Sequence, residues 1–349
     1  MAERRHPVTL QAVAERAGVS MKTASNAVNG TGRMADDTRV RVMAVVEELG
    51  YKVNVAARNL TRGRTNAVSL AVPTLKAAYL AELAEEVIEA ARELDLVVYV
   101  TTYPDDGLRG SRTYLEQFNS QLSDGLLLSL SEHEDLDAAD LDVDFPLVCL
   151  GSRTTFGNAD RVSTDEVVDA STATQYLQAR GSQTIAVVGA HEPFDAAAIS
   201  AAPEGNAELR LRGILDAISA AAGALDPRLV GVTGYDWSIG SGFRATREIV
   251  TSGIPFDGLV CLNDGLAIGA ISALRESGIR VPEDVQVIGF DNIEESAFLT
   301  PPLTTMDSRI SWIARTALER LVARIDGQAP VEPADLLTRS RLIARGTTR

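Results

Sequence analysis

Hydroxyl, ammonium and amide side chains crowd the segment from Ser20 to Asn26, which reads SMKTASN. Groups of these types hydrogen-bond to phosphate oxygens and to the base edges in the grooves of duplex DNA. Such contacts require a rigid helix whose first turn faces the groove. The chemistry therefore depends on a helix that begins close to Ser20.

The preceding residues predict a short helix and a tight turn that would orient this segment. Gly18 supplies the backbone freedom at positive φ that ends a helix, and Ser20 stands where an N-cap would begin the next one. A third helix is expected from Asp36 to Leu49. Apolar residues recur at helical spacing on one face of the first helix: Leu10, Val13, Ala14 and Ala17. This order is typical of a helix-turn-helix, whose second helix lies in the major groove.

The formal charge is divided unevenly along the chain. Residues 1–66 carry 11 Lys and Arg against 6 Asp and Glu, a net charge of +5, whereas residues 67–349 carry 22 basic and 42 acidic residues, a net charge of −20. A basic head attracts phosphate, and an acidic body stays soluble and away from DNA. The charge pattern therefore favours DNA binding by the first part of the chain alone.

From Asn66 onward, apolar strands alternate with amphipathic helices. The strands are expected at 67–72, 95–101, 124–130, 146–151, 184–190, 229–233, 258–262 and 285–290, and helices between them at 81–94, 167–180, 209–222, 241–251 and 266–277. This alternation predicts an α/β fold with parallel sheets covered on both faces, arranged as two similar halves. Ligands of such folds bind at the carboxyl ends of the strands, in the crevice between the halves.

Several function classes find no support in the sequence. No apolar run approaches the ~18 residues of a membrane helix. The charged start MAERRHPVT lacks the apolar region of a secretory signal, so we expect a cytoplasmic protein without a membrane partner. His6, His133 and His191 do not fall in the chain order of a Ser–His–Asp catalytic triad, and no P-loop or metal-ligand spacing stands out. We therefore expect no catalytic residue, cofactor or metal. Cys149 and Cys261 lie in apolar runs, which favours buried thiols.

Segments spread over nearly the whole chain resemble the lactose/galactose repressor (LacI/GalR) family. In the head these segments are VTLQAVAERAGVSMKTASNAVNG and EELGYKVNVAARNL. In the body they include SLAVPTLKAAYLAELAEEVIEAARELDLVVYV, SDGLLL, ELRLRGILDAI, CLNDGLAIGAISALRESGIRVPEDVQVIGFDN and TPPLTTM. Each string alone is weak, but their joint order is specific. The resemblance implies a sequence-specific transcriptional regulator, usually a repressor, that binds double-stranded, near-palindromic operator DNA as an oligomer and responds to a small effector.

The resemblance also implies a domain organisation. An all-α helix-turn-helix head is expected at residues 1–51, a hinge helix or linker at 52–65, and an effector-binding and dimerisation body at 66–349. The body would be like a periplasmic binding protein, with doubly wound parallel-sheet subdomains at 66–163 plus 292–325 and at 164–291 plus 326–349. The chain would pass between them near 163–165, 289–292 and 325–328, and a last strand at 337–344 would return to the second subdomain.

By family position, Met21, Lys22 and Asn26 would read DNA bases. Lys22 can donate to guanine O6 and N7, Asn26 can form two hydrogen bonds with adenine, and Met21 can touch a thymine methyl group. The family often has arginine where Asn26 stands, so another member's operator does not transfer to this chain. Hydroxyl residues would contact phosphates or cap helices: Thr9, Ser20, Thr23 and Ser25.

Residues 54–60 match the family's hinge helix. Leu60 of each subunit would wedge into the minor groove at the operator centre and kink it, and the small Ala57 would let two hinges approach each other. Packing of Leu60 on the body is the alternative. Val53 replaces a proline that is common in the family, which softens the expected start of the hinge. A segment this short is not a stable helix by itself, so its folding on DNA would make affinity sensitive to the spacing of the heads.

The family's cleft residues map onto both subdomains. In the first they are Thr74, Leu75, Tyr79, Tyr103 and Ser129. In the second they are Arg210, Trp237, Asn263, Asp264 and Asp291. Together they offer hydroxyl, amide, guanidinium and carboxylate groups and a flat aromatic face, which suits a sugar-like effector. A nucleoside or another metabolite is the alternative. Structural roles are the alternatives for three of them: Asp264 can cap a helix, Asp291 can support the crossing segment, and Trp237 can belong to the core.

A solute-binding protein of the sugar-transport type, without a DNA-binding role, is the alternative interpretation. The body alone would suit that function, but the basic helix-turn-helix head and the lack of an export signal favour the regulator. The chain ends soon after its last strand without leucine heptads, which favours a homodimer over a tetramer.

Overall fold

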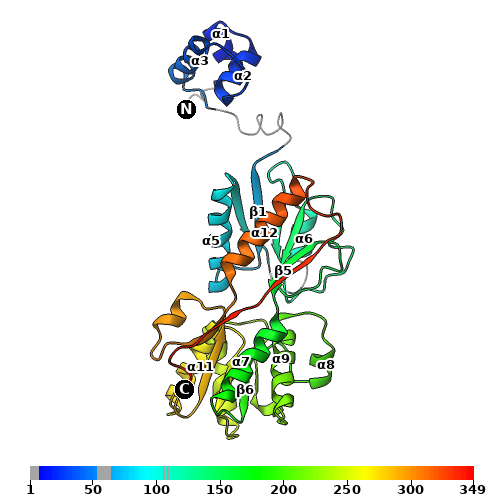
Figure 1. Ribbon diagram of the computed structural model, residues 1–349, viewed down its shortest axis with the longest axis vertical. Helices are drawn as coiled ribbons and strands as arrows, with labels where there is room; N and C mark the ends of the chain where they lie inside the picture. The colour runs from blue at the N-terminus through cyan, green and yellow to red at the C-terminus, as the bar shows by residue number, and fades with distance from the viewer. Residues whose placement is uncertain (1–7, 53–63, 105–106, 108–109) are drawn as a thin grey trace, which may run out of the picture. The chain divides into compact units, whose positions relative to one another are not determined.

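Two compact units make up the structure. The computed structural model describes residues 8–52, 64–104, 107 and 110–349, and the chain divides between Thr65 and Asn66. The first unit contains helices in its described residues, and the second holds two six-stranded sheets (Figure 1). The hinge positions Ala57 and Leu60 lie outside the described residues.

The first unit packs helices around a small apolar core. Helices α1 (Leu10–Ala17), α2 (Met21–Asn29) and α3 (Asp36–Leu49) confirm the predicted helix-turn-helix and third helix. Gly18 ends α1 in the left-handed region with φ 66°, as a helix C-terminus favours. The core consists of small and β-branched side chains on the facing sides of the helices: Val13, Ala14, Ala17, Ala24, Ala27, Val42 and Val45.

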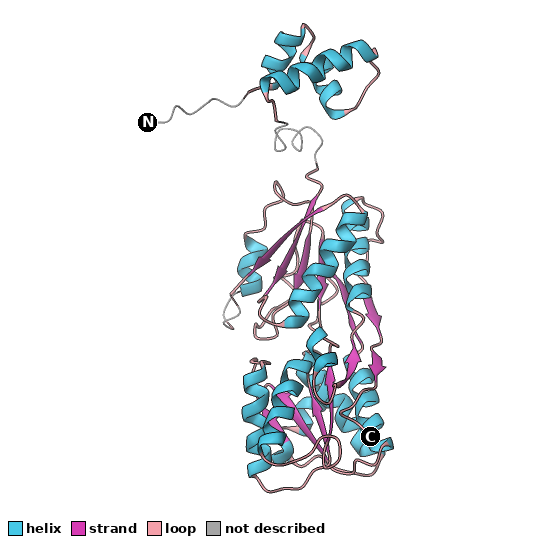
Figure 2. Cartoon of the chain, turned by 90° about the vertical axis from the view of Figure 1, so that its left-hand side faces the viewer, coloured by secondary structure: helices cyan, strands magenta, loops and turns pink. Residues whose placement is uncertain are grey.

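The first sheet of the second unit is parallel and has the strand order β11-β5-β4-β3-β1-β2. Its strands are β1 (Ala67–Val72), β2 (Val97–Thr102), β3 (Leu126–Ser129), β4 (Leu147–Leu150), β5 (Asp160–Thr164) and β11 (Asp335–Thr338). Helices α5 (Ala78–Glu93) and α12 (Ile310–Ile325) pack together and share one apolar core with the sheet (Figure 2). Helix α6 (Gly110–Glu116) contributes to a second core. Strand β1 is buried at every position, which explains its continuous apolar run AVSLAV.

The second sheet has the strand order β12-β10-β9-β8-β6-β7, and only β12 runs antiparallel to its neighbour in the described structure. Its strands are β6 (Ile185–Ala190), β7 (Val230–Val232), β8 (Gly258–Cys261), β9 (Gln286–Phe290), β10 (Thr304–Asp307) and β12 (Arg341–Ile343). The helices around it are α7 (Glu166–Ala179), α8 (Ala196–Ala201), α9 (Asn206–Ala220), α10 (Ile239–Thr251) and α11 (Asp264–Glu276), with short 3-10 turns η1 (Pro227–Leu229) and η2 (Glu294–Phe298).

Close helix contacts stabilise the second subdomain. Helix α7 packs on α9, and α10 packs on α11. At the α10–α11 contact, a Cβ atom added to Gly269 would lie 2.0 Å from the Ile239 carbonyl oxygen. Glycine is therefore required there, because any side chain would force the two helices apart.

The chain passes between the sheets at three places in the described body (Figure 1). It leaves the first sheet after β5, at Thr164. It returns between Asp307, at the end of β10, and Ile310, at the start of α12. It passes again between β11 and β12, at residues 338–341. The predicted second passage at 289–292 and third passage at 325–328 are wrong: residues 292–307 belong with the second sheet, and residues 326–338 belong with the first.

The first error arises where a buried strand is polar, and the second where short strands lie at the sheet edges. Strand β10 reads TTMD, so it lacks the hydropathy of the other strands. Its hydroxyls are satisfied internally, because Thr304 Oγ1 lies 2.9 Å from Thr348 Oγ1 and Thr305 Oγ1 donates to Asp264 over 2.6 Å. Hydrogen bonding thus compensates for the burial of this strand. The predicted strand at 337–344 is likewise wrong, because this stretch is divided between β11 in the first sheet and β12 in the second.

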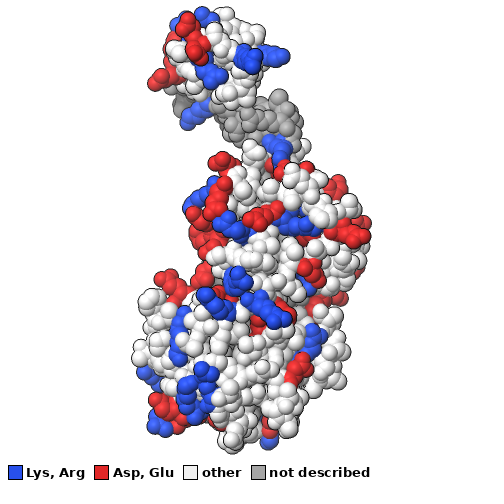
Figure 3. All heavy atoms as spheres, viewed as in Figure 1, with Lys and Arg blue, Asp and Glu red and all other residues white. Residues whose placement is uncertain are grey.

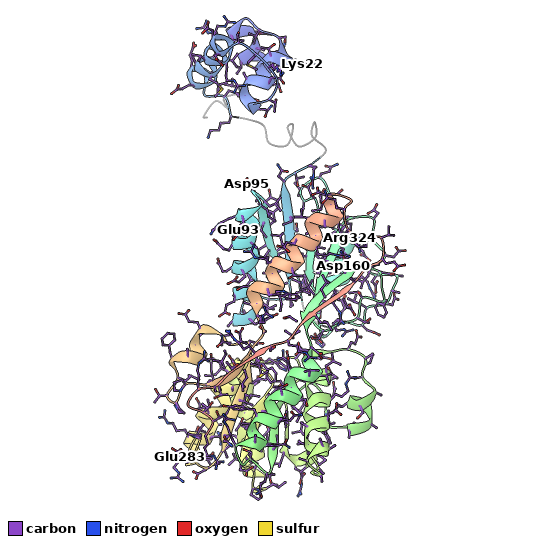
Figure 4. All side chains as sticks on the ribbon, in the orientation of Figure 1. Lys22, Glu93, Asp95, Asp160, Glu283 and Arg324 are labelled. Carbon is purple, nitrogen blue, oxygen red and sulfur yellow. The ribbon has the colours of Figure 1, made fainter. Side chains whose placement is uncertain are left out.

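A buried carboxylate on β5 fastens α12 to the first sheet. Asp160 is fully buried and pairs with Arg324 at 2.7 Å and Arg320 at 2.9 Å; Figure 4 shows Asp160 and Arg324 together. The Ala334 N–H also donates to it, over 2.8 Å. Burial raises the pKa of Asp160, but the hydrogen bonds from the two arginines outweigh burial and hold the pKa below its ordinary value. The carboxylate therefore stays charged and binds segments that arrive late in the sequence.

Asp160→Asn should lower the free energy of unfolding by about 3 kcal/mol, because it removes the charge partner of two largely buried arginines. Denaturant unfolding at pH 7 measures the loss. Folding lowers the pKa of Asp160, so its stabilisation is complete above the ordinary aspartate pKa and is lost as the pH falls through the folded-state value.

The matched control is Asp284→Asn, because Asp284 pairs with Arg280 on the surface and its loss should change stability little. An Asp160→Asn protein as stable as the wild type at pH 7 would show that this pair does not fasten α12.

Candidate nucleic-acid interface and ligand cleft

Helix α2 exposes the side chains at its start. Met21 is 54% exposed and Lys22 is also exposed, whereas Ala24 and Ala27 on the opposite face are buried in the head. Figure 4 shows Lys22 at the outer edge of the head. The helix sequence MKTASNAVN contains no acidic residue, so the exposed turn is cationic.

Side-chain caps fix the direction of α1 and α2. Thr9 Oγ1 accepts a hydrogen bond from the Ala12 N–H over 3.2 Å. Ser20 Oγ accepts from the Thr23 N–H over 3.1 Å and lies 2.9 Å from Thr23 Oγ1. The capping alternative for Thr9 and Ser20 is therefore present in the structure, and these caps orient the first turn of α2.

Ser25 and Asn26 are half-buried on α2. Asn29 Nδ2 donates to the Ser25 carbonyl oxygen over 2.9 Å and lies 3.2 Å from Ser25 Oγ. The Asn26 amide lies against Gly32, where φ is 76° and an added Cβ would come within 2.6 Å of Asn26 Nδ2. Gly32 therefore leaves the space that the Asn26 side chain occupies.

A buried guanidinium forms the centre of the candidate cleft in the body. Arg210 on α9 is 7% exposed. Its Nε donates to Glu166 over 2.5 Å, its Nη1 donates to the Leu262 carbonyl oxygen, and its Nη2 lies 3.9 Å from Asp291. The guanidinium also lies over the Phe290 ring, 4.6 Å from its centroid. The structure thus brings the predicted residues Arg210 and Asp291 together.

Glu166, which the sequence pattern did not single out, is the main counter-charge of Arg210. It is the first residue of α7, directly after the first passage between the sheets. The hydroxyls of Ser152 and Thr164 donate to its Oε1 over 3.1 and 3.0 Å. A carboxylate at this position is also stabilised by the partial positive charge at the N-terminal end of the helix. The signal for it was the pair Asp165–Glu166 at the carboxyl end of a strand, where open α/β sheets place ligand-binding groups.

Trp237 and Asn263 are held by structural hydrogen bonds. Trp237 Nε1 donates to the Gly189 carbonyl oxygen over 2.9 Å. Asn263 Oδ1 accepts from the Leu266 N–H over 2.7 Å, and its Nδ2 donates to the Trp237 carbonyl oxygen over 3.2 Å. Asn263 therefore caps α11 and ties the loop that carries Trp237 to the start of that helix.

Asp264 is turned inward and is fully buried. Its carboxylate accepts from the Ile293 N–H over 3.1 Å and from Thr305 Oγ1 over 2.6 Å. Burial, and secondarily the charge of Asp291, raise the pKa of Asp264 well above its ordinary value. The cap expected of Asp264 thus belongs to Asn263, and Asp264 instead holds the segment that follows β9.

Tyr79 is the first-subdomain residue that faces the charged cluster. It is half-buried, and burial, followed by the charges of Asp291 and Glu166, raises the pKa of its phenol. Its hydroxyl therefore stays protonated and available as a hydrogen-bond donor.

The other predicted residues of the first subdomain lie at or after the ends of their strands: Ser129 is the last residue of β3, and Thr74, Leu75 and Tyr103 follow β1 and β2. Tyr103 is buried and its hydroxyl donates to the Ser129 carbonyl oxygen. Thr74 Oγ1 accepts from the Lys76 N–H over 3.1 Å, and the neighbouring Leu75 is 46% exposed. Among the described residues, these four make no hydrogen bond or ion pair with Arg210, Glu166 or Asp291.

Polar contacts that the sequence did not indicate join the two subdomains beside this cluster. Glu132, after β3, accepts from the Asn206 N–H at the start of α9 over 3.1 Å. Arg153, after β4, pairs with Glu204 at 3.1 Å. Burial raises the pKa of Glu132 to about 7 despite the hydrogen bond from Asn206 and the charge of Arg153. One of these contacts is therefore sensitive to pH near neutrality.

Aromatic stacking extends this junction. The His133 ring stacks on Tyr235 with centroids 4.1 Å apart, and Tyr235 lies 4.3 Å from His191. His191 in turn lies 5.6 Å from Trp237 and pairs with Glu208 at 3.3 Å. The polar surroundings of the two histidines gave no sequence signal for this ladder, because it links residues from both subdomains.

Comparisons with known proteins identify the family. The family model for bacterial regulatory proteins, lacI family, matches residues 9–54, and the model for a periplasmic binding protein-like domain matches residues 174–348. The HTH-type transcriptional repressor PurR of Escherichia coli O1:K1 / APEC is 31% identical over 345 residues, which cover 97% of this chain and 96% of that protein. This chain belongs to the LacI family.

Further relatives agree with this assignment. The ribose operon repressor of Haemophilus influenzae is 27% identical over 317 residues, covering 91% of this chain and 92% of that protein. The crystal structure of the Lac repressor dimer bound to operator and the anti-inducer ONPF has a TM-score of 0.84 at 28% identity and covers 98% of this chain and 99% of that one. The protein is a LacI-family DNA-binding transcriptional regulator with an effector-binding body, and these matches support that interpretation rather than a transport receptor.

The proteins that this LacI-family regulator matches are transcriptional regulators rather than enzymes. No helix in the described part of the chain is long and apolar enough to cross a bilayer.

Arg210→Ala should destabilise this regulator by about 3–5 kcal/mol, because it leaves Glu166 buried without its partner. The midpoint of denaturant unfolding measures the loss. The double variant Arg210→Met/Glu166→Gln removes both charges and should recover much of the lost stability. Wild-type stability in Arg210→Ala would show that the ion pair does not hold this junction.

Proposed function

We propose that the protein represses transcription as a homodimer that binds a near-palindromic operator, and that a small sugar-like effector in the cleft changes its affinity for DNA. The main observation in support is the exposed, cationic first turn of α2 on a capped three-helix head. The operator complex of the Lac repressor dimer supports the proposal. Because such a regulator acts on chromosomal DNA, a cytoplasmic location forms part of it.

In this proposal Met21 and Lys22 read bases directly, and Asn26 does so one turn further along α2. Lys22 suits guanine O6 and N7, and the Met21 thioether suits a thymine methyl group. Thr23 and Ser25 contact phosphates from the flanks of the helix, and the capping residues Thr9 and Ser20 support the same backbone contacts.

We extend the proposal to the hinge segment. Ala57 and Leu60 lie outside the described residues, so their roles rest on the family pattern in the sequence. Leu60 would enter the minor groove at the operator centre, and Ala57 would permit two hinges to meet. Such a contact works only when the two heads are correctly spaced, which links operator affinity to the state of the body.

The effector role is assigned to the cluster around Arg210. Asp291 offers an acceptor, Tyr79 offers a donor, and the Trp237 ring offers an apolar face to a sugar. Asn263, Thr74, Leu75, Tyr103 and Ser129 would lie at the margins, and the buried Asp264 would shape the site from behind. The complex of the transcriptional regulator CelR with cellobiose, 27% identical with a TM-score of 0.68, supports a sugar as the ligand class.

The junction contacts give the switch a physical basis. The pairs Glu132–Asn206 and Arg153–Glu204 and the stack of His133 on Tyr235 hold one relative arrangement of the two subdomains. An effector that binds another arrangement of the subdomains more tightly shifts the protein toward that arrangement. The size of the shift is limited by the ratio of the effector's affinities for the two arrangements. The resulting change in the body would alter the spacing of the two heads.

Lys22→Ala should reduce the affinity ratio between a selected operator and random duplex by about 5- to 150-fold, because one base contact is worth ~1–3 kcal/mol. The operator is first selected from a random duplex pool with the wild-type protein. Gel-shift titrations of both duplexes at one fixed salt concentration then give the ratio.

Arg41→Ala is the matched control for Lys22→Ala. Arg41 is an exposed cation of the head that lies on α3, so its loss should leave the ratio unchanged. Equal weakening of operator and random duplex by Lys22→Ala would contradict its role in reading bases and would assign it to a phosphate.

A panel of mono- and disaccharides should contain a ligand that raises the melting temperature of the full chain by mass action. The same sugar should change operator affinity by at least about 5-fold, as a coupling of ~1 kcal/mol requires. Trp237→Ala should lose most of the thermal shift. A sugar that raises the melting temperature but leaves operator affinity unchanged would contradict the effector role.

A further inference from the structure

A cavity of about 620 Å³ lies where segments between the two subdomains meet, and we call it the crossover cavity. Its wall is supplied by the end of β9, by the passage from β10 into α12, by the passage from β11 into β12, and by α5. The residues used below are Glu82, Asp291, Arg309, Trp312, Arg339 and Arg341. Arg210, Trp237 and Tyr103 do not line it, so it meets the effector cleft only at Asp291.

One wall of the crossover cavity is cationic. Arg309, Arg339 and Arg341 come from the second and third passages, and Figure 3 shows basic side chains gathered where these segments cross the body. Arg341 pairs with Asp307 at 3.2 Å, and Arg309 Nη1 donates to Thr338 Oγ1 over 3.1 Å. In the described part of the chain, no carboxylate lies within ion-pair distance of Arg309 or Arg339. Arg309 and Arg339 therefore line the cavity without an ion-pair partner among the described residues.

The start of α12 adds to this preference for negative charge. Arg309 is its N-cap residue, with φ 55°, and its own side chain does not cap the helix. The Asp307 carboxylate accepts from the Arg309 N–H over 2.9 Å. The N-terminal end of a helix carries a partial positive charge. Trp312 in the first turn also lines the cavity and supplies an apolar surface for a carbon skeleton.

Three carboxylates line the same cavity: Glu82, Asp291 and Asp307. Only 9% of the Asp291 side-chain surface is exposed, and its nearest ion-pair contact is Arg210 Nη2 at 3.9 Å. Among the described residues none donates a hydrogen bond to the Asp291 carboxylate. Asp291 lines the cavity, so its carboxylate can accept a hydrogen bond from a ligand there. Glu82 also lines the cavity, and its Oε1 accepts a hydrogen bond from the Glu294 N–H over 3.3 Å.

We propose that the crossover cavity is a second binding site, for a small molecule with an oxyanion at one end and hydrogen-bond donors at the other. Arg309, Arg339 and Arg341 hold the oxyanion by charge-assisted hydrogen bonds. An ammonium or hydroxyl group of the ligand donates to Asp291, and the carbon chain lies along Trp312. This site goes beyond the proposed function. It shares only Asp291 with the effector cluster, and its anion-binding arginines do not belong to that cluster.

The position of the site gives it a regulatory consequence. Its ligand would touch both the second and the third passage, which are the segments that must change when the subdomains move. Its affinity therefore depends on the arrangement of the subdomains, and by linkage it shifts that arrangement in turn. The regulator would respond to an anionic metabolite as well as to the effector.

The test uses four probes on the full chain, at constant ionic strength. O-phosphoethanolamine carries both the anion and a donor, glycerol 3-phosphate carries the anion and hydroxyls, inorganic phosphate carries the anion alone, and glycerol lacks the anion. We expect O-phosphoethanolamine and glycerol 3-phosphate to raise the melting temperature most, phosphate less, and glycerol not at all. Calorimetric titration gives the dissociation constants.

Variants assign the binding to the cavity. Arg309→Gln/Arg339→Gln should weaken O-phosphoethanolamine at least 10-fold, and Asp291→Asn should weaken it more than it weakens phosphate. Arg315→Gln is the matched control, because this exposed arginine of α12 pairs with Glu93 and does not line the cavity; it should bind as the wild type does. The melting temperature of each variant without probe verifies folding.

Two results would overturn the proposal. One is a shift with both phosphorylated probes no greater than with sodium chloride of equal ionic strength. The other is unchanged binding in Arg309→Gln/Arg339→Gln while that variant stays folded, because binding would then lie elsewhere, for example at the basic head. Neither result bears on operator or sugar binding, which are measured separately.

Discussion

A guanidinium buried inside a protein must be neutralised where it lies, and this requirement organises the body of the protein. Arg210 meets it with Glu166 at 2.5 Å and with Asp291 further away. The three residues come from α9, from the start of α7 and from the end of β9. The pair therefore fixes how the elements of the second subdomain meet at the first passage. Ser152 and Thr164, which lie at or just after the ends of strands of the first subdomain, also donate to Glu166. The Glu166 carboxylate therefore contacts both subdomains.

The junction between the subdomains is consequently polar rather than apolar. Each subdomain has its own apolar core, and the contacts between them are ion pairs, backbone hydrogen bonds to carboxylates, and stacked rings. Contacts of this kind can be exchanged for contacts with a ligand at modest cost, because both states satisfy the polar groups. An apolar junction of the same size would resist opening. The chemistry of the junction thus suits a body that changes arrangement when a small molecule binds.

The sequence predicted the parts of the fold that rest on local pattern. The head followed from apolar spacing, from Gly18 and from the caps at Thr9 and Ser20, all of which act within a few residues. The apolar strands and most helices of the body were equally visible. Strand β10 and the division of residues 335–343 were not, because buried threonines and short edge strands carry no hydropathy signal. Helix α12 was also missed, and its place is fixed by Asp160, which lies far from it in sequence.

Site prediction met the same limit. Family positions located Arg210, Asp291 and Tyr79, which the structure brings to one cluster. They did not reveal Glu166, Glu132 or the histidine stack, because these residues gain their roles from partners that fold next to them. Asp264 illustrates the reverse case. Its place directly before an apolar helix suggested a cap or a ligand contact, yet tertiary hydrogen bonds from Ile293 and Thr305 turn it inward.

The two tryptophans of the chain fall at different places in this body. Trp237 lies beside Arg210 and His191 in the cleft, and Trp312 lines the crossover cavity. Indole emission depends on local polarity and on nearby quenchers such as an imidazolium. Replacing either tryptophan by phenylalanine would leave a single fluorophore, so intrinsic fluorescence could follow the occupancy of each location separately, in real time and without a label.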